Sequence, residues 1–172
     1  GMKALESDKY IKLYEFVDLK QFKIEERGSM VQMYSENTKL IEDTIAQINK
    51  IGHIKAYKRA DIPEKFQYRD SERIGDIVVV ADAPYYIRVV PKEVQMAAPN
   101  VQASGNGGTH GWDPEEQDMH GIFYAEGPSF KRNMKIATFQ NIHIYPMMLD
   151  LFGISKLPSD GDRNVLRDIL VK

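Results

Sequence analysis

The segment Arg73–Asp82 constrains the fold of this chain more than any other. Its sequence, RIGDIVVVAD, has an unbroken run of β-branched residues at its centre. Such a run is typical of a strand whose side chains are buried on both faces of a sheet. We expect Tyr85–Val90 to pair with this strand across a short turn. The sequence therefore predicts a sheet that has Arg73–Asp82 among its strands.

Upstream of this strand, the sequence predicts the remaining elements of a small α+β lobe over residues 1–90. One of them is a helix with apolar residues at helical spacing, an N-cap at Asn37 and a stop at Gly52. The strand–helix–strand–strand order suits a lobe that packs and shapes a cleft, and nothing in it has the pattern of a reaction centre. The predicted elements are strands Tyr10–Asp18 and Ser29–Tyr34, helix Thr38–Ile51 and strand His53–Arg59.

Residues 91–172 have a different pattern, and we expect them to form the second part of the chain. A long loop rich in glycine and proline comes first. A helix start follows at Asp113, with Pro114 at the first helical position. The apolar helix near the end has Pro146 in its first turn. The predicted elements are loop Pro91–Gly108, buried strand Ile122–Ala125, helix Asn141–Phe152 and a short final helix Asn164–Val171.

Composition excludes several classes of protein. With 172 residues, the chain fits one ordinary domain or two small lobes. A net charge of -2 disfavours binding to a nucleic-acid polymer, and the lack of cysteine excludes disulfides and thiolate chemistry. No apolar run approaches the roughly 20 residues of a membrane span, and the first residues do not resemble a signal peptide. Gly1 before Met2 is typical of a scar left by tag removal.

His110 is the strongest candidate for chemistry. It lies in Gly108-Thr109-His110-Gly111, where glycines permit backbone conformations closed to other residues and leave room for an ion or substrate. A neutral imidazole on such a loop is a good zinc ligand. The local pattern is equally compatible with a loop histidine that is hydrogen-bonded to backbone. The residues alone leave these two alternatives open.

The wider sequence resembles the type I phosphodiesterase/nucleotide pyrophosphatase family of the alkaline phosphatase superfamily. The resemblance is most specific around His110, where Gly108–Gly111 is followed by Trp112-Asp113, by Met119–Phe123 and by Gly127–Phe130. It continues into NIHIYPMMLDLFGI and, upstream, into DIPEKFQYRDSERIGDIVVVAD. It covers most of the chain and implies an α/β fold that is part of an alkaline-phosphatase-like sheet, with the α+β lobe attached.

This resemblance implies a function for His110. In the family, a histidine at this position completes one of two zinc sites, and a zinc-bound threonine or serine attacks phosphorus to form a covalent intermediate. The substrates are phosphodiesters or nucleotide pyrophosphates. No Thr or Ser of this chain lies in the family's nucleophile context, so we assign no catalytic residue here. The residues that we expect to line the incomplete site are Thr109, Gly111, Asp113 and His120.

Other polar groups have plainer interpretations. We expect His120 to be a hydrogen-bonded core histidine in preference to a metal ligand, and His53 and His143 to be structural. The acidic residues from Asp113 to Asp118 favour a solvated helix start over a loose site for a divalent ion. A basic run is best explained as a solvated face, with phosphate contact as the alternative. It comprises Lys55, Lys58, Arg59, Lys65 and Arg69.

We therefore expect a fragment of a zinc-dependent phosphodiesterase or nucleotide pyrophosphatase that is inactive alone and holds no tightly bound zinc. The family's nucleophile and remaining ligands lie in a half that this sequence lacks. The alternatives are a non-enzymatic binding module and a complementing subunit, and a truncated gene model or a frameshift would explain the missing half. Uncovered apolar surface predicts a homo-oligomer or pairing with the missing N-terminal half. The family is usually exported or membrane-anchored, but no signal in this sequence determines the location or the substrate.

Overall fold

The computed structural model describes residues 1–26, 28–90, 107–155 and 157–171, so most of the expected loop Pro91–Gly108 lies outside the described residues. The chain divides into two compact units, Gly1–Gly121 and Ile122–Lys172. The expected division into residues 1–90 and 91–172 stays a prediction.

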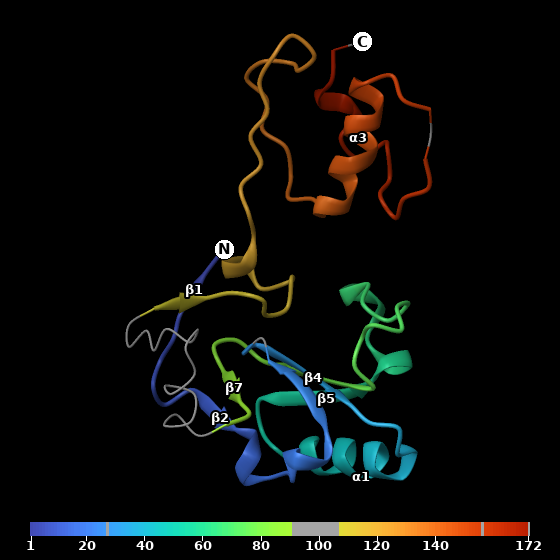
Figure 1. Cartoon of the computed structure of the whole chain (residues 1–172). Helices are drawn as coiled ribbons and strands as arrows, with labels where there is room; N and C mark the ends of the chain where they lie inside the picture. The colour runs from blue at the N-terminus through green and yellow to red at the C-terminus, as the bar shows by residue number, and fades with distance from the viewer. Residues whose placement is uncertain (27, 91–106, 156, 172) are drawn as a thin grey trace, which may run out of the picture. The chain divides into compact units, whose positions relative to one another are not determined.

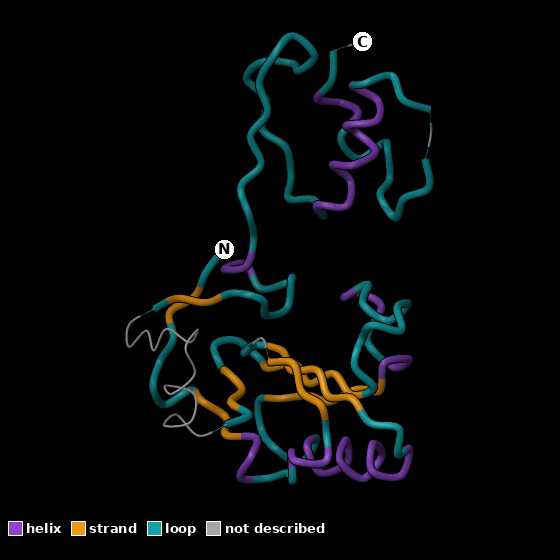
Figure 2. The backbone as a smooth tube through the Cα atoms, in the orientation of Figure 1, coloured by secondary structure: helices purple, strands orange, loops and turns teal. Residues whose placement is uncertain are grey.

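A four-stranded antiparallel sheet organises the first unit. Its strands are β3 (Lys23–Glu26), β4 (Met30–Tyr34), β6 (Ile77–Ala81) and β5 (Ile54–Lys58), in the spatial order β3-β4-β6-β5. Figure 2 shows these strands side by side, with helix α1 (Thr38–Ile48) along one face. Ile77, Val78 and Val79 are almost completely buried, although successive side chains point to opposite faces. The predicted burial of this strand on both faces and the strand–helix–strand–strand lobe are therefore confirmed.

Asn37 begins α1 as predicted, because its side chain accepts a hydrogen bond from the backbone N–H of Leu40 at 3.1 Å. The helix ends at Ile48, before the expected stop at Gly52. The side chain of Asn49 instead bonds both backbone groups of Ala56 on the sheet edge, as acceptor at 2.8 Å and as donor at 3.1 Å. The Asn49 side chain, directly after the last residue of α1, therefore satisfies the backbone N–H and C=O of Ala56 on the outer edge of β5.

The pairing predicted for Tyr85–Val90 is wrong. Strand β7 (Tyr86–Arg88) pairs in parallel with β2 (Tyr10–Lys12) and does not join β6. Strand β6 already has β4 and β5 on its two edges, so neither edge remains free for a third partner. The predicted strand Tyr10–Asp18 is shorter in the structure and ends at Lys12, because a 3-10 turn begins at Leu13 and buries that side chain. Strand β3 was not predicted, because its sequence KIEE lacks an apolar alternation.

A small core around helix α3 (Ile144–Leu151) holds the second unit together (Figure 1). The helix follows a 3-10 turn at Asn141–His143, and Pro146 lies in its first turn as predicted. It ends at a left-handed Gly153, whose N–H bonds Asp150 while the next N–H bonds Leu149. The buried centre consists of Met147, Leu166 and Ile169, with Phe123, Phe130, Phe139, Ile144, Leu151 and Leu170 packed against it.

Of the elements predicted for residues 122–172, the buried strand is wrong and the final helix is shorter than predicted. Ile122–Ala125 is not a buried strand, because these residues have no strand partner within the described part of the chain and Ile122 and Tyr124 are 99% and 80% exposed. The predicted final helix is a single 3-10 turn, Arg167–Ile169. The two α-helices of the described residues have 11 and 8 residues, and no helix among those residues has the length and apolarity to cross a membrane.

Candidate functional site

The backbone just before His110 is held by the start of the chain. Strand β8 (Gly108–Thr109) pairs antiparallel with β1 (Lys3–Ala4), so that Thr109 lies opposite Lys3. The N–H of Leu5 donates to the carbonyl of Gly107 at 3.0 Å and extends this ladder by one bond. The predicted loop around His110 is therefore tied to a strand on its N-terminal side.

His110 itself is exposed, and its backbone carbonyl accepts a hydrogen bond from the hydroxyl of Ser29 at 3.2 Å. Gly111 has a φ of 96°, which L-residues with side chains rarely adopt. A Cβ at this position would also lie 2.8 Å from the Ser29 Oγ. The expected need for glycine beside His110 therefore has two causes, the left-handed backbone and the close approach of Ser29.

The next residue anchors the segment in the main core. Trp112 is 4% exposed and belongs to the large apolar cluster that includes β4 and β6. Its indole N–H donates to the carbonyl of Tyr85 at 2.7 Å. A buried indole with a satisfied N–H resists displacement, because moving it exposes apolar area and breaks a hydrogen bond. The backbone at residue 112 is thus fixed within two residues of His110.

Asp113 and Glu115 form ion pairs with Lys65 instead of starting an α-helix. The ammonium of Lys65 contacts Asp113 and lies 2.9 Å from Glu115. The hydrogen bond to Asp113, and then that to Glu115, raise the pKa of Lys65 above its usual value. The expected helix at Asp113 is wrong, since one 3-10 turn at Gln117–Met119 follows. No apolar stripe follows Asp113 at helical spacing, and packing of such a stripe is what stabilises most helices.

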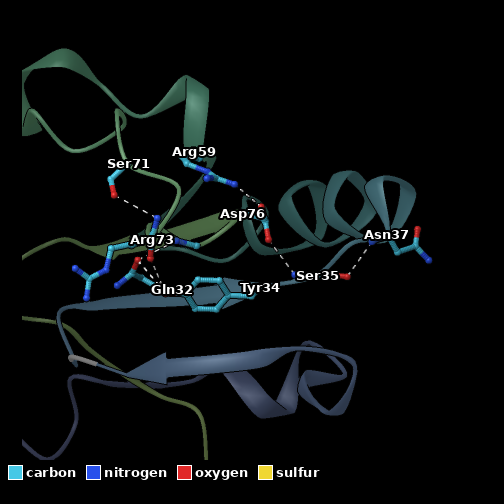
Figure 3. Close-up of polar contacts among 9 residues, drawn as sticks. Gln32, Tyr34, Ser35, Asn37, Arg59, Ser71, Arg73 and Asp76 are labelled. Carbon is cyan, nitrogen blue, oxygen red and sulfur yellow. Dashed lines mark hydrogen bonds and ion pairs between the residues drawn. The ribbon is translucent and has the colours of Figure 1, made fainter.

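Three of the five side chains of the basic run form ion pairs with acidic residues. Lys58 pairs with Glu42 at 2.7 Å, and Arg59 pairs with Asp76 at 2.7 Å. Figure 3 shows Asp76 between Arg59 and Ser35, whose backbone N–H also donates to this carboxylate. With Lys65 held by Asp113 and Glu115, three cations of the run are neutralised by neighbours. This arrangement suits a structural, solvated face better than a phosphate-contacting one.

The other histidines have separate surroundings. His120 is exposed, so the prediction that it is a core residue is wrong, and the missing strand after it explains why. His53 stacks on Tyr85 with ring centroids 3.8 Å apart. The Nδ1 of His143 accepts the backbone N–H of Asp162 at 2.9 Å. His53 and His143 are therefore structural, as expected.

The donor set within the described residues is incomplete for a metal centre. No group of three or more His, Cys, Asp or Glu side chains that would hold a metal occurs in residues 1–26, 28–90, 107–155 and 157–171. An exposed imidazole on an anchored backbone fits the role of one zinc ligand. Of the residues expected to line the site, Thr109, Gly111 and Asp113 belong to the anchored segment. Sequence reasoning missed Ser29, which lies 81 positions from its partner and has no local signal.

Comparisons with known proteins agree with this fold. Ectonucleotide pyrophosphatase/phosphodiesterase family member 7 of Mus musculus is 31% identical over 159 residues, which are 91% of this chain and 33% of that protein. Family member 5 of Homo sapiens is 26% identical over 170 residues, 99% of this chain and 34% of that protein. The chain thus spans about a third of the length of the curated relatives it matches.

A solved structure extends the likeness to three dimensions. Murine ectonucleotide pyrophosphatase / phosphodiesterase 5, an inactive variant in complex with AMP, has a TM-score of 0.85 at 23% identity, over 99% of this chain and 43% of that chain. This likeness confirms the expected partial α/β fold. The family model for type I phosphodiesterase / nucleotide pyrophosphatase matches residues 1–113, a range that includes both the sheet and His110. The relatives are phosphodiesterases and nucleotide pyrophosphatases by name, and this chain is a member of the type I phosphodiesterase / nucleotide pyrophosphatase family.

Proposed function

We propose that this chain supplies one zinc ligand, His110, to a metal-dependent hydrolase of phosphodiester or nucleotide pyrophosphate bonds. The observation that carries the proposal is the exposed imidazole on a backbone held by β1, Ser29 and the buried Trp112. A metal ligand needs such support, because its direction must be set before the ion binds. Zinc, when bound, supplies Lewis acidity to the phosphate group.

We propose further that the 172-residue chain is inactive alone. Catalytic zinc sites normally have three protein ligands, and the described residues contain no group of three or more His, Cys, Asp or Glu side chains that could hold a metal. A single donor does not make a catalytic zinc site. The nucleotide-directed names of the relatives, and the AMP bound to the murine structure, support a nucleotide or other phosphodiester as substrate of the whole protein.

A zinc titration of the isotope-labelled chain tests the role of His110. We expect Zn²⁺ to shift the imidazole resonances of His110 at lower concentration than those of His53 or His143, because those two rings are already engaged. The affinity should be far below that of a four-ligand site. His120→Ala is the matched control, since that histidine is also exposed but lies outside the segment that Ser29 and Trp112 hold. Zinc binding that is unchanged in His110→Ala would contradict the ligand assignment.

Hydrolysis is tested on the same preparation with excess Zn²⁺ and a chromogenic phosphodiester. We expect no turnover above the buffer rate for the unchanged chain. Turnover that disappears in His110→Ala but persists in His120→Ala would overturn the proposed inactivity while supporting the ligand. The two measurements therefore separate the two parts of the proposal.

We also propose that residues 122–172 pack against further protein, the rest of a phosphatase-like fold. Helix α3 buries Met147 and Leu149 on one side, yet Tyr145, Met148 and Phe152 are exposed on another. A helix that is apolar all round is typical of one buried in a larger protein. The solved murine chain is more than twice as long as the part matched here, so it contains such further protein.

Light scattering on a size-exclusion column distinguishes the possible occupants of this apolar surface. Association of the isolated chain that is abolished by Phe152→Ser would show that a second copy covers the surface when nothing else does. A monomer over the whole concentration range, with no binding of apolar dye at residues 122–172, would contradict a need for any cover.

A further inference from the structure

We infer that Ser29 is a positioning residue for His110, which fixes the direction of the backbone from which the imidazole projects. Among the described groups that hold this segment, the Ser29 hydroxyl contacts His110 itself, through the 3.2 Å hydrogen bond to its carbonyl. The inference rests on the proposed function, because a fixed direction matters only if the ring binds an ion.

Ser29 is suited to this role because it belongs to the sheet and not to the surface. The residue is 1% exposed, and its carbonyl accepts the N–H of Ala81, the last residue of β6, at 2.8 Å. The carbonyl of the preceding Gly28 accepts the N–H of Ile87 in β7 at 2.6 Å. Two strands therefore fix the backbone of Ser29, and its hydroxyl transmits that fixed position to His110.

Gly111 completes the arrangement. Its φ of 96° turns the chain immediately after His110, and a side chain there would meet the Ser29 Oγ at 2.8 Å. Upstream, the β8 pairing with β1 fixes the backbone as far as Thr109. The peptide units on both sides of His110 are thus restrained, and the remaining freedom is that of its own side-chain torsions.

The Lys65 ion pairs hold the same segment in a different way. The Lys65 side chain is 40% exposed, and its partners begin three residues after His110. Exposed ion pairs are weak and screened by salt, whereas a hydrogen bond between the neutral Ser29 hydroxyl and a backbone carbonyl does not depend on charge. If Ser29 sets the direction of His110, loss of its hydroxyl must loosen the backbone at His110, and loss of the Lys65 ammonium must not.

The experiment measures ¹⁵N relaxation of the backbone N–H groups of His110 and Gly111 in the metal-free, full 172-residue chain. We expect Ser29→Ala to lower their order parameters toward the flexible range, below about 0.6, from near the rigid value of about 0.85. The hydroxyl-deletion control is Ser35→Ala, which removes an acceptor of the Asn37 N–H far from His110 in sequence. Lys65→Gln is the control for the ion pairs.

An unchanged backbone order parameter at His110 and Gly111 in a folded Ser29→Ala variant overturns the inference, as does an equal loss in Lys65→Gln. Should Ser29→Ala fail to fold, Gly111→Ala decides, because it keeps the hydroxyl but forces it away from the His110 carbonyl. The same loosening is then expected, and a rigid backbone at His110 contradicts the inference. Because no metal is present, these results are independent of the zinc titration, which alone tests whether His110 is a ligand.

Discussion

Residues 1–121 and 122–172 differ in where their apolar side chains lie. In the first unit, the exposed large apolar residues within the described chain are Met2 and Phe16. The second unit is less than half as long and has many more, namely Ile122, Tyr124, Met134, Ile136, Tyr145, Met148, Phe152, Ile154, Leu157, Val165 and Val171. The first unit buries most of its large apolar residues in its own core, whereas many of those in the second unit are exposed.

The difference follows from what each unit offers as a packing partner. In the first, α1 and the irregular segments cover a four-stranded sheet, whose two faces collect one large and one smaller cluster. In the second, one helix of eight residues has only extended chain and short turns to pack against. A sheet satisfies backbone polar groups while it buries side chains, and extended chain without a partner strand does neither.

The largest expected effect comes from Ile77→Ala in the centre of the sheet. Ile77 is 0% exposed, and its truncation should cost about 2–5 kcal/mol of unfolding free energy through a cavity in the main cluster. Urea unfolding followed by Trp112 fluorescence measures it, since the chain has a single tryptophan and that residue lies in the same cluster.

Leu166→Ala is the matched change in the second unit, where Leu166 is equally buried. If the two units are independent, this variant should leave the Trp112 transition within about 0.5 kcal/mol of that of the unchanged chain. A shift as large as that of Ile77→Ala would break the comparison, because it would mean that both units unfold as one.

An intermediate effect is expected from Gln32→Leu in β4. Gln32, which Figure 3 labels, is buried, and its side-chain oxygen accepts the backbone N–H of Gly75 at 2.9 Å. Leucine would leave that buried N–H without an acceptor, which costs about 1–3 kcal/mol. The space around Gly75 is narrow, because a Cβ added to it would lie 3.0 Å from atoms of Gln32, Met33 and Ile77.

Ser71→Ala is the control for this network, since Ser71 accepts the Arg73 N–H at an exposed position. Its cost should stay within about 0.5 kcal/mol. Equal losses in the two variants would indicate that the network stabilises the molecule through its exposed bonds and not through the buried one.

Sequence reasoning succeeded where the signal and its physical cause lie in the same segment. The β-branched residues of β6 themselves indicate that this strand is buried, and the side chain of Asn37 itself indicates where α1 begins. It failed where pairing is decided elsewhere. Strand β7 joins β2 because β6 has no free edge, and a reader of Tyr85–Val90 alone cannot know that.

The candidate site shows the same limit. The glycines around His110 and the acidic residues after it are visible in the sequence, but the groups that hold them are distant. Ser29 gave no signal, and Lys65 was grouped with a basic face instead of with Asp113. Ile122–Ala125 failed for a related reason, since its apolar pattern predicts a buried strand and the described residues provide no strand to pair with it.

The smallest expected effect is that of Lys65→Met. This variant tests whether surface contacts of the first unit, residues 1–121, contribute to its stability beside its core. The Lys65 side chain is 40% exposed, so its ion pairs should contribute about 0.2–1 kcal/mol at low salt and almost nothing near 1 M, where the Debye length is about 3 Å. Folding raises the pKa of Lys65, so the folded state holds this proton more tightly. The stabilisation is therefore full below the unfolded pKa, near 10.4, and declines as pH rises above it.

Urea midpoints from Trp112 fluorescence at pH 8 and pH 11, each at low and high salt, measure this contribution. Lys58→Met is the matched control, because it breaks a similar exposed pair with Glu42 that does not touch the His110 segment. We expect similar losses of stability for both variants, but faster amide exchange at Asp113, Glu115 and Glu116 in Lys65→Met alone. A loss in Lys65→Met that is independent of salt and pH would assign its effect to packing of the lysine stem against neighbouring side chains instead of to charge.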